Sequence, residues 1–392
     1  MLEFPSRLAA SVPRSRIREL SDLAASVENP LRLYFGESNV PTPGFIKEAA
    51  KRAIDDGYTY YTHNAGYLDL RQAIAEQARR LHGFDYDPHG EVVVTAGGVE
   101  AMFLALYATL EPGSKAIIVS PCWPNVASIV RMVGATPVEV PLKDAGGRFE
   151  LDREALAAAL DPSVRVLFVN SPSNPTGWIM SDDEEAFLTR VAEERGLCLV
   201  LDQVYERIVF DGPVAPVRHM GRLRDRLVLL NSVSKAYSMT GWRLGYALGP
   251  ERIVEQMAKL QEFVVSHAPA PSQRAALAAI TEGEGFVREM QGRYRALRDL
   301  ACERLSRCPR VELVRPQGAF YVFPRVEGLS DSFGFCRRLL MEKGVGLAPG
   351  CAFGAGGEGH VRLCFAVEEE ILAPALDRLA ESLASMRGQP LS

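Results

Sequence analysis

Lys235 and Arg243 lie eight residues apart and carry the side chains best suited to chemistry. Lys235 follows the apolar run Leu227–Asn231 in a stretch rich in serine. A lysine placed there either needs an anionic partner or loses its proton, and a neutral amine is a nucleophile that forms Schiff bases with carbonyls. Arg243 offers a planar fork of N–H donors that suits a phosphate. The pair therefore indicates a ligand that carries both an aldehyde and a phosphate.

Asp202 and Tyr205 add groups that would serve pyridoxal phosphate, a ligand whose aldehyde and phosphate are attached to a pyridine ring. Asp202 follows the apolar run Leu197–Leu201. A carboxylate there could keep the ring nitrogen protonated, which makes the ring a strong electron sink. Tyr205 could donate a hydrogen bond to the phenolic oxygen of the ring. The alternative for these two residues is a helix N-cap aspartate followed by a core tyrosine.

Three loops that follow apolar runs carry further candidates. Asn174 lies between two prolines, which can hold its amide still beside a ring oxygen. The segment Thr95–Val99 places two glycines before a helix, where backbone N–H groups can face an anion. Trp123 could stack on a planar ring, and the alternative is a core or surface tryptophan.

Arg362 stands out in the otherwise apolar run His360–Phe365. A buried arginine needs an anion close to it. That anion is either an internal carboxylate or the carboxylate of a substrate, and the sequence leaves both open.

These candidates need a scaffold, and the middle of the chain predicts one. Short apolar runs alternate with helical patterns near Val99–Leu110, Val126–Val133, Asp152–Ala159 and Asp182–Glu194. Such alternation is typical of a mainly parallel sheet with helices on both faces, and functional side chains gather at the carboxyl ends of its strands. Seven strands are predicted at Glu91–Thr95, Ala116–Ser120, Thr136–Val140, Val164–Val169, Leu197–Leu201, Leu227–Asn231 and Leu244–Leu248.

The pattern changes after Pro250. A mostly helical stretch runs from Glu251 to about Cys308 with a break at Ala268–Pro271, and a mixture of strand-like and helical pieces follows. We therefore predict an α/β protein with a large domain over residues 45–285. A smaller α+β domain is predicted to combine residues 1–44 with residues 286–392.

Composition excludes several classes of protein. The chain has 392 residues, of which 47% are hydrophobic and 24% charged, as expected for a soluble globular protein. The net charge of −5 argues against non-specific nucleic-acid binding. No apolar run is long enough to span a membrane. The seven cysteines are scattered, and neither they nor the histidines have metal-site spacing, so we expect no metal and a cytoplasmic location.

Together, these motifs resemble those of the fold-type I pyridoxal-phosphate enzymes, specifically the class I and II aminotransferases of the aspartate aminotransferase superfamily. The resemblance covers nearly the whole chain, in order and with plausible spacing. It implies pyridoxal 5'-phosphate as cofactor and a homodimer with the active sites at the interface. A transcription regulator on this fold would carry a basic extension, for which the residues before Gly36 leave no room.

The resemblance also implies a role for each residue around the cofactor ring. Lys235 would bind the cofactor covalently and later move the substrate's α-proton. Asp202 would pair with the ring nitrogen, and Tyr205 and Asn174 would donate to the ring oxygen. Trp123 would stack on the ring.

Other positions match the family's contacts to the phosphate and to the substrate. The phosphate would be bound by Gly98, Val99, Ser232 and Arg243. Tyr61 would reach the phosphate of the neighbouring subunit. Arg362 would bind the α-carboxylate of the substrate, with Asn174 and Gly36 beside it. Val99 departs from the family pattern because many members carry a hydroxyl residue there, so only its backbone N–H can serve.

The implied activity is ping-pong transfer of an amino group between an L-amino acid and a 2-oxo acid. The alternative is another pyridoxal-phosphate reaction on the same fold: β-elimination by a C–S lyase, decarboxylation or cyclisation. The cofactor supports all of these, and the reaction depends on which substrate bond stands perpendicular to the ring. The sequence does not identify which arginine, if any, would bind a side-chain carboxylate, so it does not indicate aspartate as the substrate.

Overall fold

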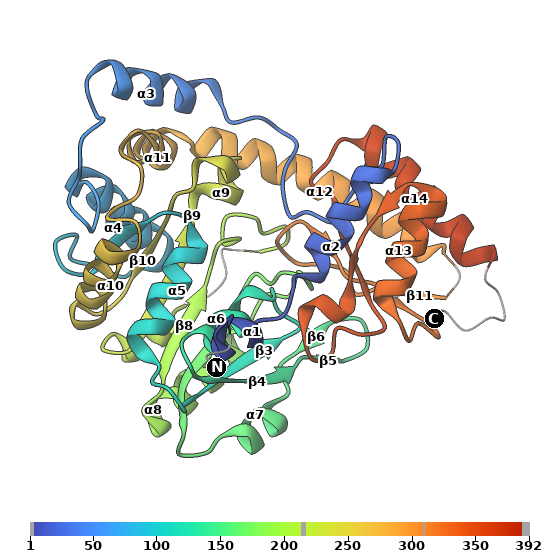
Figure 1. The fold of residues 1–392 in the computed structure, drawn as a ribbon, viewed down its shortest axis with the longest axis horizontal. Helices are drawn as coiled ribbons and strands as arrows, with labels where there is room; N and C mark the ends of the chain where they lie inside the picture. Colours follow the sequence, from blue (N-terminus) through green and yellow to red (C-terminus); the bar gives the residue numbers. More distant parts are fainter. Residues whose placement is uncertain (1–3, 213–216, 309, 386–392) are drawn as a thin grey trace.

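A seven-stranded sheet forms the centre of the computed structural model, which describes residues 4–212, 217–308 and 310–385 (Figure 1). The strands lie in the order β2 (Val92–Thr95), β10 (Gly245–Leu248), β9 (Leu227–Ser232), β8 (Cys198–Asp202), β7 (Val164–Asn170), β3 (Lys115–Ser120) and β4 (Thr136–Pro141). Only β10 is antiparallel to its neighbours within this sheet. The predicted mainly parallel sheet is confirmed, and every predicted strand lies within one residue of an observed one at each end.

The strands are apolar on both faces because both faces are covered. Alternate side chains of one strand enter different cores: Leu229 packs into one hydrophobic cluster, and Val228 and Leu230 pack into the other. A strand repeats every two residues, so this alternation places one cluster on each side of the sheet. Continuous apolar runs were therefore the correct signal for a sheet buried on both faces.

Helices from both sides supply the rest of these two cores. One cluster contains side chains from α5 (Gly98–Thr109), α6 (Asn125–Met132) and α10 (Glu251–Val264). The other contains side chains from α4 (Leu68–His82), α7 (Arg153–Ala159), α8 (Asp182–Arg195) and α11 (Ala270–Glu282). Local signals set the ends of α8: Ser181 and Glu184 form a capping box, and Gly196 ends the helix with φ of +65°, where a side chain would be strained.

Residues 16–32, in blue, lie beside the C-terminal elements, in orange and red, in Figure 1, whereas the first helix contacts α6. β1 (Leu31–Arg32) pairs in parallel with β14 (Val345–Gly346), and α2 (Arg16–Leu23) contacts α13 (Ser332–Lys343). A three-stranded sheet has the order β12 (Tyr321–Val322), β16 (Val361–Cys364) and β15 (Ala348–Pro349), and β11 (Val311–Glu312) pairs with β13 (Arg325–Val326). The remaining elements are α1 (Arg7–Ser11), α3 (Gly44–Asp55), α9 (Val233–Ala236), α12 (Glu284–Ser306), α14 (Glu369–Ser385) and the hairpin β5 (Lys143–Asp144)–β6 (Phe149–Glu150).

This arrangement agrees with an α+β unit built from both chain ends. The division into residues 45–285 against 1–44 with 286–392 stays a prediction, and residues 1–3, 213–216, 309 and 386–392 of it lie outside the described residues. Within those described, no helix has the length and apolar character needed to cross a membrane.

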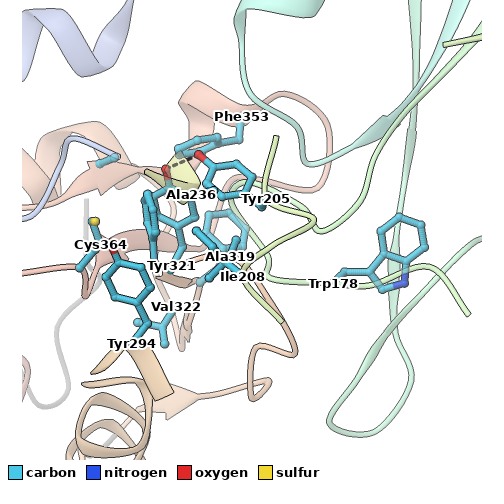
Figure 2. Close-up of a cluster of buried hydrophobic side chains, with 14 of the residues drawn as sticks. Trp178, Tyr205, Ile208, Ala236, Tyr294, Ala319, Tyr321, Val322, Phe353 and Cys364 are labelled. Carbon is cyan, nitrogen blue, oxygen red and sulfur yellow. Dashed lines mark hydrogen bonds between the residues drawn. The ribbon is translucent and has the colours of Figure 1, made fainter. Parts of the chain in front are cut away.

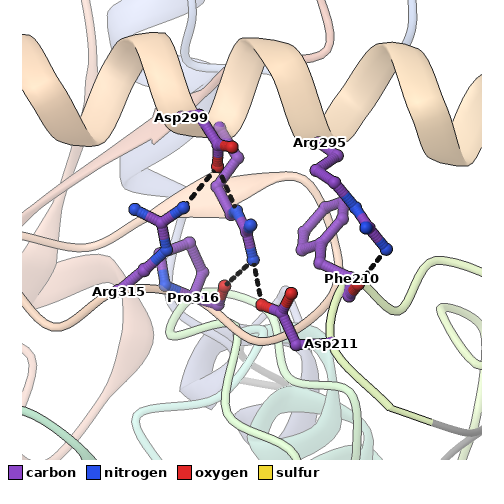
Figure 3. Close-up of polar contacts among 7 residues, drawn as sticks. Phe210, Asp211, Arg295, Asp299, Arg315 and Pro316 are labelled. Carbon is purple, nitrogen blue, oxygen red and sulfur yellow. Dashed lines mark hydrogen bonds and ion pairs between the residues drawn. The ribbon is translucent and has the colours of Figure 1, made fainter.

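Arg298 links the long helix α12 to Asp211 in the segment that follows β8. Figure 3 labels its partners Asp211, Asp299 and Pro316. Its side chain is 3% exposed and its Nη1 lies 2.6 Å from Oδ2 of Asp211. Its Nε donates to Asp299 at 2.8 Å, and Nη1 also donates to the carbonyl oxygen of Pro316 at 3.3 Å. A buried guanidinium with several acceptors is costly to break apart. These contacts join α12 to the segment after β8 and to the loop between β11 and β12.

Candidate functional site

A cavity of about 690 Å³ opens at the carboxyl ends of β7, β8 and β9. Residues from both ends of the chain line its other side. The structure brings all but one of the sequence-predicted site residues to this cavity. They are Gly36, Gly98, Val99, Trp123, Asn174, Asp202, Tyr205, Ser232, Lys235, Arg243 and Arg362.

Lys235 is carried by the one-turn helix α9, directly after β9. Its Nζ donates to the carbonyl oxygen of Gly36 at 2.6 Å, and no carboxylate among the described residues pairs with it. Burial, together with the nearby charges of Arg362 and Arg243, lowers the pKa of Lys235 to about 8. A larger fraction of this amine is therefore neutral near physiological pH than of an ordinary lysine, as a nucleophile requires.

Asp202 ends β8 and lines the same cavity as Lys235. Burial raises the pKa of its carboxyl group to about 6, while the Val204 N–H, which donates to Oδ1 at 3.1 Å, and the charge of Lys235 act in the opposite direction. No helix begins at Asp202 in the described chain, so the N-cap alternative is wrong. A buried carboxylate with so few donors is suited to a cationic partner such as a protonated ring nitrogen.

Tyr205 meets Tyr321, a cavity residue that the sequence did not reveal (Figure 2). Their hydroxyl oxygens lie 2.6 Å apart. Burial raises the pKa of Tyr205 well above its usual value, so the hydroxyl stays protonated, and either of the two hydroxyl groups can be the donor in this bond. The core-tyrosine alternative is partly right, because Tyr205 also packs edge-to-face against Phe320. Gly36 leaves room for this pair, since a Cβ there would lie 1.8 Å from the Tyr321 hydroxyl.

Arg362 projects from β16 into the cavity and is 2% exposed. Its Nη1 donates to Oδ1 of Asn174 at 2.9 Å, and Nη2 donates to the carbonyl oxygen of Tyr34. Its Nε is buried without a partner, and no ion pair of the described residues includes it. The internal-carboxylate alternative is therefore wrong. A buried guanidinium with an unused donor is a site for an anion such as a substrate carboxylate.

Asn174 accepts from Arg362 through Oδ1, so its amide N–H groups remain available to the cavity. Its own backbone N–H donates to Oδ1 of Asn170 at 2.7 Å, which fixes the loop after β7. Trp123 lies half-buried in the loop after β3, where it lines the cavity and also packs against one of the two hydrophobic clusters.

The other end of the cavity is shaped for an anion. A Cβ on Gly97 would lie 2.3 Å from Nη2 of Arg243, so only glycine lets this guanidinium approach the N-terminus of α5. Backbone N–H groups at that helix end, those of Gly98 and Val99 among them, favour a phosphate. The Ser232 hydroxyl donates to the Leu244 carbonyl oxygen at 2.7 Å, so a phosphate contact would require it to exchange this bond.

These observations fit pyridoxal phosphate. The site has a buried carboxylate for the ring nitrogen, a helix N-terminus with an arginine for the phosphate, and a lysine with a lowered pKa in the same cavity. Arg18 also lines the cavity, with its guanidinium carbon 5.2 Å from the ring centroid of Phe35. It was not predicted, because its position on α2 becomes visible only when the N-terminal segment is folded against the sheet.

Tyr61 is the one predicted site residue that the structure does not bring to the cavity. It is 89% exposed, and its ring lies edge-on to His267 at a centroid distance of 5.7 Å. Its predicted contact requires a second copy of the chain and stays a prediction.

Comparison with known proteins places the chain in a family. The family described as aminotransferase class I and II matches residues 31–379. A Bacillus subtilis protein named probable N-acetyl-LL-diaminopimelate aminotransferase is 36% identical over 372 residues, which cover 95% of this chain and 93% of that protein. The aromatic-amino-acid aminotransferase 2 of Thermococcus litoralis is 36% identical over 374 residues, covering 94% and 95%.

A solved structure agrees with these sequence matches. The aspartate aminotransferase from Thermus thermophilus with maleate has a TM-score of 0.92 and 35% identity, covering 97% of this chain and all of that one. The relatives are named for different substrates but share the transfer of an amino group. The chain belongs to the class I and II aminotransferases and is a pyridoxal-phosphate-dependent aminotransferase.

Proposed function

We propose that Lys235, Asp202 and Tyr205 carry out a ping-pong transfer of an amino group between an L-amino acid and a 2-oxo acid. The main support is that one cavity is lined by a lysine of lowered pKa, a buried carboxylate and a buried arginine whose Nε has no partner. When bound, pyridoxal phosphate supplies an electrophilic carbon and an electron sink.

Each side chain then has a task set by its position. Arg362 binds the substrate α-carboxylate through its free donor and so orients the α-carbon toward Lys235. Lys235 accepts the α-proton at Nζ and returns it, because its pKa of about 8 permits both protonation states near neutral pH. Asp202 carries the negative charge that stabilises a protonated ring nitrogen. Tyr205 and Asn174 donate toward the ring oxygen, and Trp123 covers the ring.

The phosphate end uses Arg243, Ser232 and the backbone N–H groups of Gly98 and Val99. These groups combine a positive charge with a helix N-terminus, which together fix the ligand's orientation. Val99 contributes no side-chain donor, and Gly36 contributes space and its carbonyl oxygen rather than charge.

The assembly is proposed to be a homodimer in which Tyr61 of each subunit reaches the partner's phosphate. Large apolar side chains near Tyr61 are exposed in the single chain, with Tyr60 and Phe263 each 81% exposed. The Tyr61 segment is tied to the end of α10, where Phe263 lies, because Asn64 Nδ2 donates to Glu262 at 3.0 Å. Exposed apolar surface of this kind favours burial against a second copy.

A cytoplasmic location is also proposed. The support is that the seven cysteines all have free thiols although they are spread over the fold. Free thiols are typical of proteins in a reducing compartment. Small amino acids and 2-oxo acids, rather than nucleic acid or membrane, are the proposed partners of the site.

The test is a single half-reaction. An L-amino acid added to the holoenzyme, with no 2-oxo acid present, should convert the bound cofactor to its pyridoxamine form and release one 2-oxo acid per site. The spectrum should return when a second 2-oxo acid is added. Release of ammonia and pyruvate, or of carbon dioxide, without formation of the pyridoxamine form would favour the elimination or decarboxylation alternatives.

A further inference from the structure

A chain of buried polar side chains runs behind the cavity and has no role in the function proposed above. Nε2 of His82 lies 2.8 Å from Oε2 of Glu206, and the two side chains are 4% and 3% exposed. Oε1 of Glu206 accepts from Nδ2 of Asn231 at 2.6 Å. Oδ1 of Asn231 accepts from the backbone N–H of Ser232 at 2.7 Å. The chain thus leads from the last turn of α4 to the phosphate end of the cavity.

Glu206 is an unusual residue to find so deeply buried. A buried carboxylate is costly unless its oxygens are satisfied, and here both are, one by Asn231 and one by His82. Fully satisfied polar networks are rigid and fix one geometry. Asn231 lines the cavity, whereas Glu206 and His82 do not, so Glu206 acts at a distance from any bound ligand.

The place of Glu206 in the chain explains what this network joins. Glu206 follows Tyr205 and closes the turn after β8 by donating its backbone N–H to the Gln203 carbonyl oxygen at 2.9 Å. The backbone pairing of this turn with β9 ends where the Gln203 N–H donates to Leu230 at 2.9 Å. Beyond this last backbone bond, the side-chain hydrogen bond from Asn231 to Glu206 joins the same two segments. It therefore ties the turn that carries Asp202 and Tyr205 to the segment that carries Ser232 and Lys235.

We propose that Glu206 is a positioning residue that holds the phosphate end of the site in register with the ring end, with His82 as its buried partner. The inference rests on the cofactor contacts proposed above. When the hydrogen bond between Asn231 and Glu206 is removed, Ser232 and α9 lose their fixed position relative to Asp202. Binding of the intact cofactor then weakens more than binding of a ligand that lacks the phosphate.

The test compares pyridoxal 5'-phosphate with pyridoxal as ligands of the cofactor-free protein. Glu206→Ala removes the tie, whereas Glu206→Gln keeps an acceptor for Asn231 in the same place. Glu185→Gln is the matched control, because Glu185 is an equally buried glutamate that accepts backbone N–H groups of His219 and Met220 and does not line the cavity. Titrations followed by Trp fluorescence and by cofactor absorbance give the dissociation constants, and melting curves report folding.

Glu206→Ala should raise the dissociation constant of pyridoxal phosphate about tenfold, the expected effect of one charge-assisted hydrogen bond. The dissociation constant of pyridoxal should change less than about threefold in the same variant. In Glu206→Gln and Glu185→Gln, the dissociation constants of both ligands should stay within about threefold of the wild-type values. An equal loss of affinity for both ligands, or no loss of affinity, would overturn the proposal. A merely structural role of Glu206 would affect pyridoxal phosphate and pyridoxal alike.

If Glu206→Ala does not fold, Asn231→Ala carries the same test, since it cuts the same tie but keeps the His82–Glu206 pair. Asn231→Ala is expected to lose more affinity for pyridoxal phosphate than for pyridoxal, and an equal loss of affinity for both ligands overturns the proposal. A wild-type protein that fails to bind pyridoxal phosphate would overturn the proposed function together with this inference. A wild type that binds it while Glu206→Ala shows no selectivity overturns the inference alone.

Discussion

Replacing Asp202 by asparagine should stabilise the cofactor-free protein while it removes the group that pairs with the ring. Burial raises the pKa of this carboxyl group from 3.8 to about 6, so the folded state binds its proton more tightly than the unfolded state does. Stability is therefore lost as the pH rises between these values, and the full cost is present above pH 6. A difference of about two units corresponds to about 3 kcal/mol.

Asparagine keeps the oxygen that accepts the Val204 N–H but cannot ionise. The gain in the free energy of unfolding should therefore depend on pH, rising from about 1.5 kcal/mol at pH 5 to about 3 kcal/mol at pH 8. For a chain of this length, 3 kcal/mol corresponds to roughly 4 °C in melting temperature.

The assay is thermal and urea unfolding of the cofactor-free variant and wild type at a series of pH values. Asp225→Asn is a suitable control, because Asp225 pairs with Arg226 at 2.7 Å and its pKa is lowered, so its loss should not stabilise. With pyridoxal phosphate added, the wild type should gain more stability than Asp202→Asn. A gain in the free energy of unfolding that does not vary with pH, or no gain at pH 8, would refute the interpretation of Asp202 as a buried carboxylate without a cationic partner.

Three further predictions follow from the cavity. Arg362→Lys should raise KM for every amino acid on the order of tenfold or more in steady-state assays, because lysine cannot reproduce the planar fork; an unchanged KM would exclude Arg362 as the carboxylate site. Arg18→Gln should raise KM for glutamate more than for an apolar amino acid, since Arg18 is the cavity cation without an assigned task; equal effects on both would contradict this. Burial lowers the pKa of Lys235 from 10.5 to about 8, so the stability of the cofactor-free protein should rise with pH between these values. Lys235→Met should lack that rise of about 3 kcal/mol in urea unfolding, and a variant that keeps it would show that another group titrates.

Local signals in the sequence were sufficient to predict the central sheet and the residues that follow its strands. Asp202 comes directly after an apolar run, Lys235 and Asn174 come within five residues of one, and the carboxyl ends of parallel strands meet at one edge. A strand buried on both faces is read from composition alone, which is why the predicted bounds agree so closely with β7, β8 and β9.

Contacts between distant segments were not predictable in this way. Tyr321 reaches Tyr205 across 116 positions, and Arg362 reaches the Tyr34 carbonyl oxygen across 328. Nothing local marks Tyr321, Arg18 or Glu206, because their roles depend on how the two chain ends pack against the sheet. Tyr61 illustrates the same point between molecules, since its predicted partner belongs to another copy.

The choice between alternatives at single residues also needed the structure. A lone arginine in an apolar strand has the same sequence pattern whether its partner is internal or a ligand. The unpaired Nε of Arg362 decides between the two because a buried donor without an acceptor is rare in a folded protein.

Covalent labelling tests the central claim, that the amine of Lys235 binds the cofactor. The holoenzyme is reduced with borohydride and digested, and the labelled peptide is sequenced. The label is expected on the peptide that contains Lys235, and Lys235→Ala should carry none. A protein that remains colourless in excess pyridoxal phosphate, or a label on a different lysine, would contradict the account.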